Sequence, residues 1–170
     1  MDLHEAIRAQ IAQSRWLFDG ITADVTEEQA HWTPPGNVIP IAAIWAHVLL
    51  GEDMMLTNIF NRGPEARLSF NGDFPISELI PEDSAEYVAW AHRVRINPDG
   101  MREYTKAIRD RTDAFIASLS DEDLSATMDS FMGEQPTASY IYVLLVQHVD
   151  EHGGEIACLK GIQGAKGLPY

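Results

Sequence analysis

The sequence has a single cysteine and few basic residues. Cys158 stands alone among 170 residues, so an intramolecular disulfide is excluded, and we expect it to be a small buried hydrophobe. Lysine and arginine number 12 against 26 acidic residues, which gives a formal net charge of -14. Such a chain repels phosphate backbones and anionic membrane surfaces. We therefore expect neither nucleic acid nor a membrane as its partner.

Long apolar runs are missing as well. The longest, such as residues 41–50, contain polar side chains and are too short to span a bilayer. The first residues do not show a basic segment followed by an apolar one, so we expect no secretory signal. These absences favour a cytoplasmic protein. Its 45% hydrophobic content is typical of one globular domain, here covering residues 1–170.

Phosphate-binding glycine loops, GxSxG motifs and convincing strand patterns are also lacking. What the chain does contain is helical periodicity in four long segments. We predict helices over these ranges: residues 2–19, ending at Gly20; about 40–60; 98–119; and from about 141 onward, after the break at 133–136. Residues 62–83 show no sustained period. The sequence predicts an all-α four-helix bundle with a long connection between the second and third main helices.

Three histidines fall on the core-facing sides of two predicted helices. His148 and His152 are four residues apart in the last helix, within one apolar stripe, and His47 faces inward from the second helix. A single histidine of this kind is usually a core residue bonded to a carbonyl or carboxylate. Two on one stripe favour a shared cation, because each unpaired buried imidazole costs free energy. Such a pair needs a further ligand, and in a bundle His47 would converge on it.

Acidic residues lie near these histidines in the sequence. Any of Glu52, Glu151 and Glu155 could accept a hydrogen bond from an imidazole N–H. The alternative is that these glutamates are part of the solvated helix surface. The sequence identifies no general base and no substrate-binding residue.

Taken together, these residues resemble the DinB/YfiT-like superfamily of metal-binding four-helix bundles. The similarity covers nearly the whole chain and rests on His47, the pair His148 and His152, and the run from Glu151 to Gly161, which is similar to the EHxGEIxxLxG pattern of one DinB-like subgroup. The resemblance implies that the three histidines bind a divalent transition metal, zinc or nickel most often, and leave coordination positions for water or substrate.

The same resemblance suggests a class of reaction. The superfamily includes transferases and isomerases that use glutathione, mycothiol or bacillithiol, beside many members with no known reaction. Because no cysteine accompanies the histidines, a thiol nucleophile would come from a cosubstrate. We favour a metal-dependent transferase that uses a low-molecular-weight thiol on a small electrophile. The alternatives are a metal-dependent hydrolase, which needs no thiol, and a non-catalytic stress-related binding module.

The last predicted helix also carries a second apolar face. Small and apolar side chains lie roughly opposite the histidine stripe: Val143, Val146, Gly153, Gly154 and Ala157. This face predicts a homodimer contact, and the alternative is tight packing within one subunit. Asp150, in the middle of the face, and the repulsion between two acidic chains both oppose the dimer.

Overall fold

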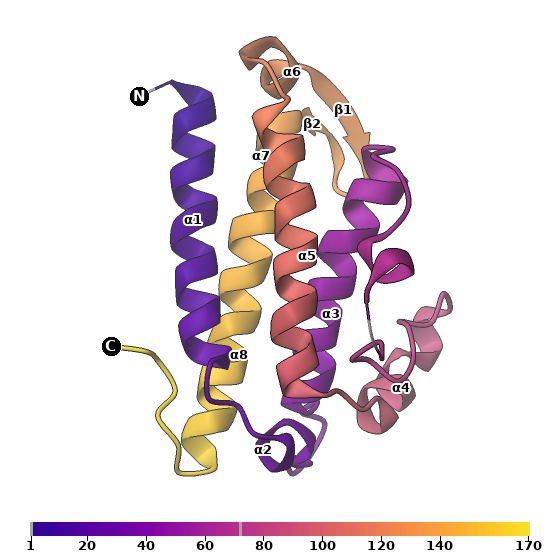
Figure 1. Ribbon diagram of the computed structural model, residues 1–170, viewed down its shortest axis with the longest axis vertical. Coiled ribbons are helices and arrows are strands. Elements are labelled where there is room, and N and C mark those ends of the chain that lie inside the picture. The colour runs from indigo at the N-terminus through magenta and orange to yellow at the C-terminus, as the bar shows by residue number, and fades with distance from the viewer. Residues whose placement is uncertain (1, 72) are drawn as a thin grey trace.

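The protein is a bundle of long helices. A computed structural model describes residues 2–71 and 73–170. In this described part, four long helices lie side by side along the longest axis of the molecule (Figure 1). Their bounds are α1 Leu3–Thr22, α3 Ile41–Met54, α5 Pro98–Ala117 and, for the last helix, three consecutive segments: α7 Thr137–Tyr142, η4 Val143–Gln147 and α8 His148–Ile162. α8 packs against both α1 and α3, and α3 also packs against α5. The predicted all-α bundle is confirmed.

Shorter elements connect these helices. They are α2 Glu27–His31, the π-helical η1 Met55–Ile59, the 3-10 helices η2 Ala66–Ser69 and η3 Ser84–Glu86, α4 Tyr87–Arg93, α6 Asp121–Ser125, and the strands β1 Thr127–Ser130 and β2 Gly133–Pro136. The two strands form an antiparallel hairpin that pairs Thr127 with Pro136. The sequence predicted a break here but no strands, because neither segment shows an apolar alternation.

The ends of the first helix follow from its terminal residues. Asp2 caps α1 by accepting a hydrogen bond from the backbone N–H of Glu5 at 2.8 Å, and the Glu5 side chain accepts from Asp2 in return. The predicted end at Gly20 is wrong, since α1 continues to Thr22. Gly20 instead permits a close approach of the C-terminal segment: a Cβ there would lie 2.7 Å from the Cβ of Pro169.

α3 is the most buried of the long helices. Residues 41–46 and 48–50 are all buried, and His47 between them is half-buried. Despite this apolar character, no helix in residues 2–71 and 73–170 is long and apolar enough to cross a membrane. Cys158, which we predicted to be buried, is exposed because the positions on either side of it in α8 face the core.

The face that suggested a homodimer packs largely within the subunit. Val146, Gly153 and Ala157 are buried. A Cβ added at Gly153 would lie 3.4 Å from Ile21 and 3.5 Å from Phe18, which are ordinary packing distances, so this glycine lies in the contact between α8 and α1. Packing inside one chain therefore accounts for these residues. The homodimer stays a prediction, without the support of this face, and sedimentation equilibrium is the measurement that tests it.

A buried carboxylate attaches the long connection to the bundle. Asp53, in the last turn of α3, is fully buried and accepts hydrogen bonds from the backbone N–H groups of Ala66 at 2.7 Å and Arg67 at 3.2 Å. From α5, the Tyr104 hydroxyl donates to it at 2.7 Å, and Arg111 forms an ion pair with it. One side chain thereby joins α3, α5 and the start of the connection.

Replacing this carboxylate is expected to destabilise the fold. Asp53→Ala leaves Arg111 and two backbone N–H groups without their acceptor, and removing one partner of a buried ion pair costs about 3 kcal/mol of unfolding free energy. Urea denaturation followed by circular dichroism measures the change. Asp110→Ala, at an exposed position of α5, is the control and is expected to stay within about 0.5 kcal/mol of the parent. Equal midpoints for the two variants would contradict the role of Asp53.

Candidate metal centre

The three predicted histidines come from the two helices expected. His47 lies in α3, and His148 and His152 lie in the first turns of α8. His148 directly follows the π-helical segment η4. A π turn accommodates an extra residue, so it rotates the residues that follow relative to those before, and such turns are frequent at functional sites. The π turn therefore helps to decide which face of α8 the two histidines take.

The three imidazole rings meet between α3 and α8. The Nε2 atoms of His47 and His148 are 2.9 Å apart. Ring centroids are separated by 4.9 Å for His47 and His148, 5.0 Å for His47 and His152, and 4.5 Å for His148 and His152. One ligand nitrogen from each ring lies within 4.8 Å of the others. The structure thus brings together all three histidines that the sequence selected.

This spacing fits a single bound cation. Two nitrogens that each lie about 2.0–2.1 Å from one ion are separated by about 2.9–3.4 Å at ligand angles of 90–109°. The distance from His47 Nε2 to His148 Nε2 is 2.9 Å, within that range. Nδ1 of His47 is buried and has no hydrogen-bond partner in the described chain. The three histidines could therefore hold one divalent metal ion through nitrogen ligands alone.

The surroundings keep two of the rings neutral. Burial, followed by the charges of His148 and His152, lowers the pKa of His47 to about 4. Burial, followed by the charge of His152, lowers the pKa of His148 to about 4 as well. Both imidazoles are thus neutral at pH 7, with one ring nitrogen of each free of a proton. A metal ion requires this form, because a protonated nitrogen has no lone pair to donate.

The orientation of the third ring is set by a carboxylate. Nδ1 of His152 is hydrogen-bonded to Oε2 of Glu155 at 2.7 Å, one turn further along α8. This bond places the proton on Nδ1 and leaves Nε2 free as a ligand, as in many sites where a carboxylate supports a metal-bound histidine. Glu155 is one of three acids that the sequence proposed for this role.

The other two acids have different partners. Glu52 is buried, and it accepts hydrogen bonds from Arg15 at 3.0 Å and from the Thr112 hydroxyl at 2.7 Å. Glu151 accepts from the side-chain amide of Gln147 at 3.0 Å. Neither glutamate is bonded to an imidazole, so Glu52 ties α3 to α1 and α5 and Glu151 is part of the exposed surface of α8.

Tyr87 is a site residue that the sequence did not reveal. Its ring stands edge-on to that of His47, with centroids 5.7 Å apart, and it is carried by α4. Burial, together with the charge of Glu155, raises the pKa of the Tyr87 hydroxyl. The sequence gave no sign that Tyr87 lies beside His47, because the two residues are 40 positions apart. The segment between α3 and α5 therefore supplies one wall of the site.

The remaining histidines have other roles. Nε2 of His4 is hydrogen-bonded to the carbonyl of Ile116 at 2.7 Å. Nε2 of His31 accepts a hydrogen bond from the backbone N–H of Ile96 at 3.0 Å. His92 is exposed. Among the described histidines, cysteines and acids, the group with metal-binding geometry is therefore the one that the sequence predicted.

Two solved structures resemble this chain. A conserved protein from Enterococcus faecalis superposes with a TM-score of 0.73 at 16% sequence identity, over 96% of this chain and 99% of that one. A variant of the mycothiol-dependent maleylpyruvate isomerase superposes with a TM-score of 0.48 at 15% identity, over 88% of this chain and 63% of that one. The first of these likenesses supports the fold. The comparison with curated proteins finds no match.

A protein-family model gives the stronger relationship. The model of the DinB superfamily matches residues 10–156, which is most of the chain and includes His47, His148 and His152. The chain belongs to the DinB superfamily.

Proposed function

We propose that His47, His148 and His152 bind one divalent transition metal, zinc or nickel, and that the protein is a metal-dependent transferase. The observation that carries the proposal is the convergence of three imidazole nitrogens within 4.8 Å in a member of the DinB superfamily. Neutral imidazole is a preferred ligand of both metals. The transferase would join a low-molecular-weight thiol to a small electrophile.

The composition of the site supports this chemistry. An ion held by three neutral imidazoles keeps its positive charge uncompensated, and it lowers the pKa of a thiol or water that binds beside it. The three-residue group contains no cysteine, so the thiol would be a cosubstrate. Glu155 fixes the ring of His152, and the ring of Tyr87 packs against that of His47 from the side of α4. All three histidines are half-buried, so their rings are not completely enclosed by the protein.

The metal assignment makes a direct prediction. Protein purified without a histidine tag is expected to contain about one zinc or nickel ion per chain, and a His148→Ala, His152→Ala double variant is expected to lose it, because a single remaining imidazole does not hold the ion. Elemental analysis by mass spectrometry measures the content. His92→Ala changes an exposed histidine and serves as the control. Equal metal content in the double variant and the parent would refute the assignment.

Glu155 should affect metal affinity without being a ligand. Glu155→Gln removes the carboxylate that accepts the Nδ1 proton of His152, and loss of such a partner weakens metal binding about 10-fold or more. Competition with a chromophoric chelator measures the dissociation constant. Glu151→Gln makes the same change of charge in the same helix but touches Gln147 instead, so it is the matched control. Indistinguishable constants for the two variants would show that the hydrogen bond does not support the site.

The reaction class is tested by a thiol requirement. We expect the metal-loaded protein to consume small electrophiles when glutathione, mycothiol or bacillithiol is present, and the metal-free protein to be inactive. Product analysis by mass spectrometry should find the adduct of the thiol and the electrophile. Turnover that is indifferent to added thiol would replace the transferase with a hydrolase. Metal binding without any turnover would instead favour the non-catalytic binding module.

A further inference from the structure

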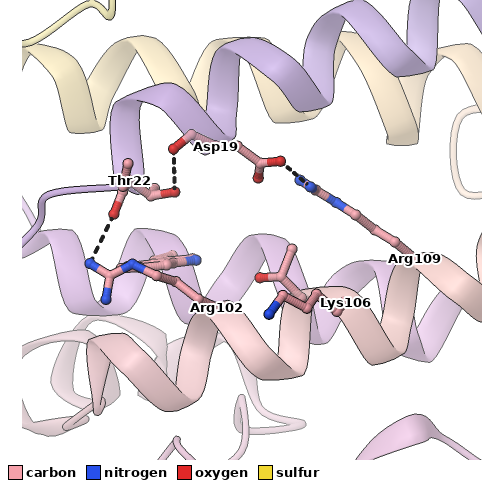
Figure 2. Close-up of a pocket in the computed structure, with 8 residues that line it drawn as sticks. Asp19, Thr22, Arg102, Lys106 and Arg109 are labelled. Atoms are coloured by element: carbon pink, nitrogen blue, oxygen red, sulfur yellow. Dashed lines mark hydrogen bonds and ion pairs between the residues drawn. The ribbon is translucent and has the colours of Figure 1, made fainter.

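A cavity lined by several charged side chains lies between α1 and α5. It has a volume of about 280 Å³, and its lining includes Asp19 and Thr22 of α1 and Trp45 of α3. Arg102, Lys106 and Arg109 extend into it from α5, as Figure 2 shows. Trp45 and His47 are two residues apart in α3, which turns them about 200° from each other around the helix axis. The cavity is therefore on the opposite side of α3 from the histidine site.

The cavity gathers positive charge in an acidic protein. An adjoining cavity between the same two helices shares Arg109 and is lined also by Arg8, Arg15 and Asp113. Five of the chain's 12 basic residues line these two cavities, against two acids, although the formal net charge is -14. The excess of cations on this face, in so acidic a chain, calls for a physical cause.

Each of the three cations from α5 has an acidic partner. Asp19 forms an ion pair with Arg109 inside the cavity. Asp99 pairs with Arg102 at 2.6 Å and Glu103 with Lys106 at 2.7 Å, but the side chains of both acids are 98% and 63% exposed, respectively. Water screens charges at such exposed positions strongly. These two pairs are therefore weak, so Arg102 and Lys106 remain able to attract an anion in the cavity.

Several buried hydrogen-bond donors in the lining of this cavity have no partner. Four buried side-chain nitrogen or oxygen atoms of the described residues have no hydrogen-bond partner, and three of them belong to this lining: Trp45 Nε1, Arg102 Nε and Arg109 Nε. Each of these three atoms carries an N–H. Buried donors are nearly always satisfied in folded proteins, so three in one cavity indicate a missing acceptor. The fourth atom is Nδ1 of His47, in the metal centre.

We propose that this cavity binds the oxyanion group, carboxylate or phosphate, of a small metabolite. An oxyanion has several acceptor oxygens, which suits the unpaired N–H groups, and its charge is complementary to the three cations from α5. The Arg102 guanidinium lies over the indole ring of Trp45, 5.8 Å from its centroid, which holds this cation at the cavity. A volume of about 280 Å³ limits the ligand to a small molecule.

The indole N–H of Trp45 offers a specific readout. Inorganic phosphate or succinate is titrated against the full-length protein at constant pH and ionic strength, with chloride as the replaced ion, and the indole N–H signals are followed by 15N NMR. Trp45→Phe identifies the signal among the four tryptophans. We expect a saturable shift of the Trp45 signal with at least one of the two anions. The anion that produces it tells a phosphate site from a carboxylate site.

Charge-matched variants decide whether the anion binds in this cavity. Arg109→Gln is expected to raise the dissociation constant of the anion about 10-fold or more, because the variant loses a charged hydrogen-bond donor. Lys106→Gln should raise this constant by a smaller factor. The Lys106 side chain is 70% exposed, so this variant folds even if Arg109→Gln does not. Arg93→Gln, at the exposed pair with Glu78, should leave the dissociation constant unchanged. The proposal is overturned if neither anion gives a saturable shift, or if Lys106→Gln and Arg93→Gln bind equally well.

Discussion

Burial of nearly all of α3 is the constraint on which the arrangement of the other helices depends. A helix that is apolar on all sides is stable only when neighbours remove every face from water. α2, α4, α5 and α8 all pack against it. His47 interrupts the buried run, and burial there holds its imidazole in the neutral form by lowering its pKa to about 4. The enclosure of α3 thus creates both the core and the chemical state of one candidate ligand.

Two adjacent buried acids near the end of α3 fix how it sits in the bundle. Glu52 is bonded to Arg15 of α1 and Thr112 of α5, and Asp53 to Tyr104 of α5. Buried carboxylates are tolerated only when paired, so α3 cannot slide or rotate without breaking these bonds. Because these acids stand five and six residues after His47 in the same helix, they also fix the position of that imidazole relative to α8. A rigid scaffold of this kind suits a site that must hold its geometry.

Many features of this protein are local, and the sequence predicted them. Helical periods placed the long helices. The predicted end at Gly20 was wrong because the close approach of Pro169, and not the end of the helix, requires that glycine. The pair His148 and His152 was recognisable because residues four apart in a helix share one face. The hairpin at β1 and β2 escaped prediction, since its exposed strands carry no apolar alternation to mark them.

The sequence by itself determined the helices, their inward faces and the three histidines, because each of these follows from residues within a few turns of one another. Only the tertiary structure decided that Glu155, and not Glu52, bonds an imidazole, and that Tyr87 stands beside His47. The same holds for the cations of α5 beside α1 and for the packing of Gly153 on that helix. A periodic pattern fixes the direction of a side chain around its own helix. What lies opposite that side chain is set by the packing of distant segments, which periodicity does not encode.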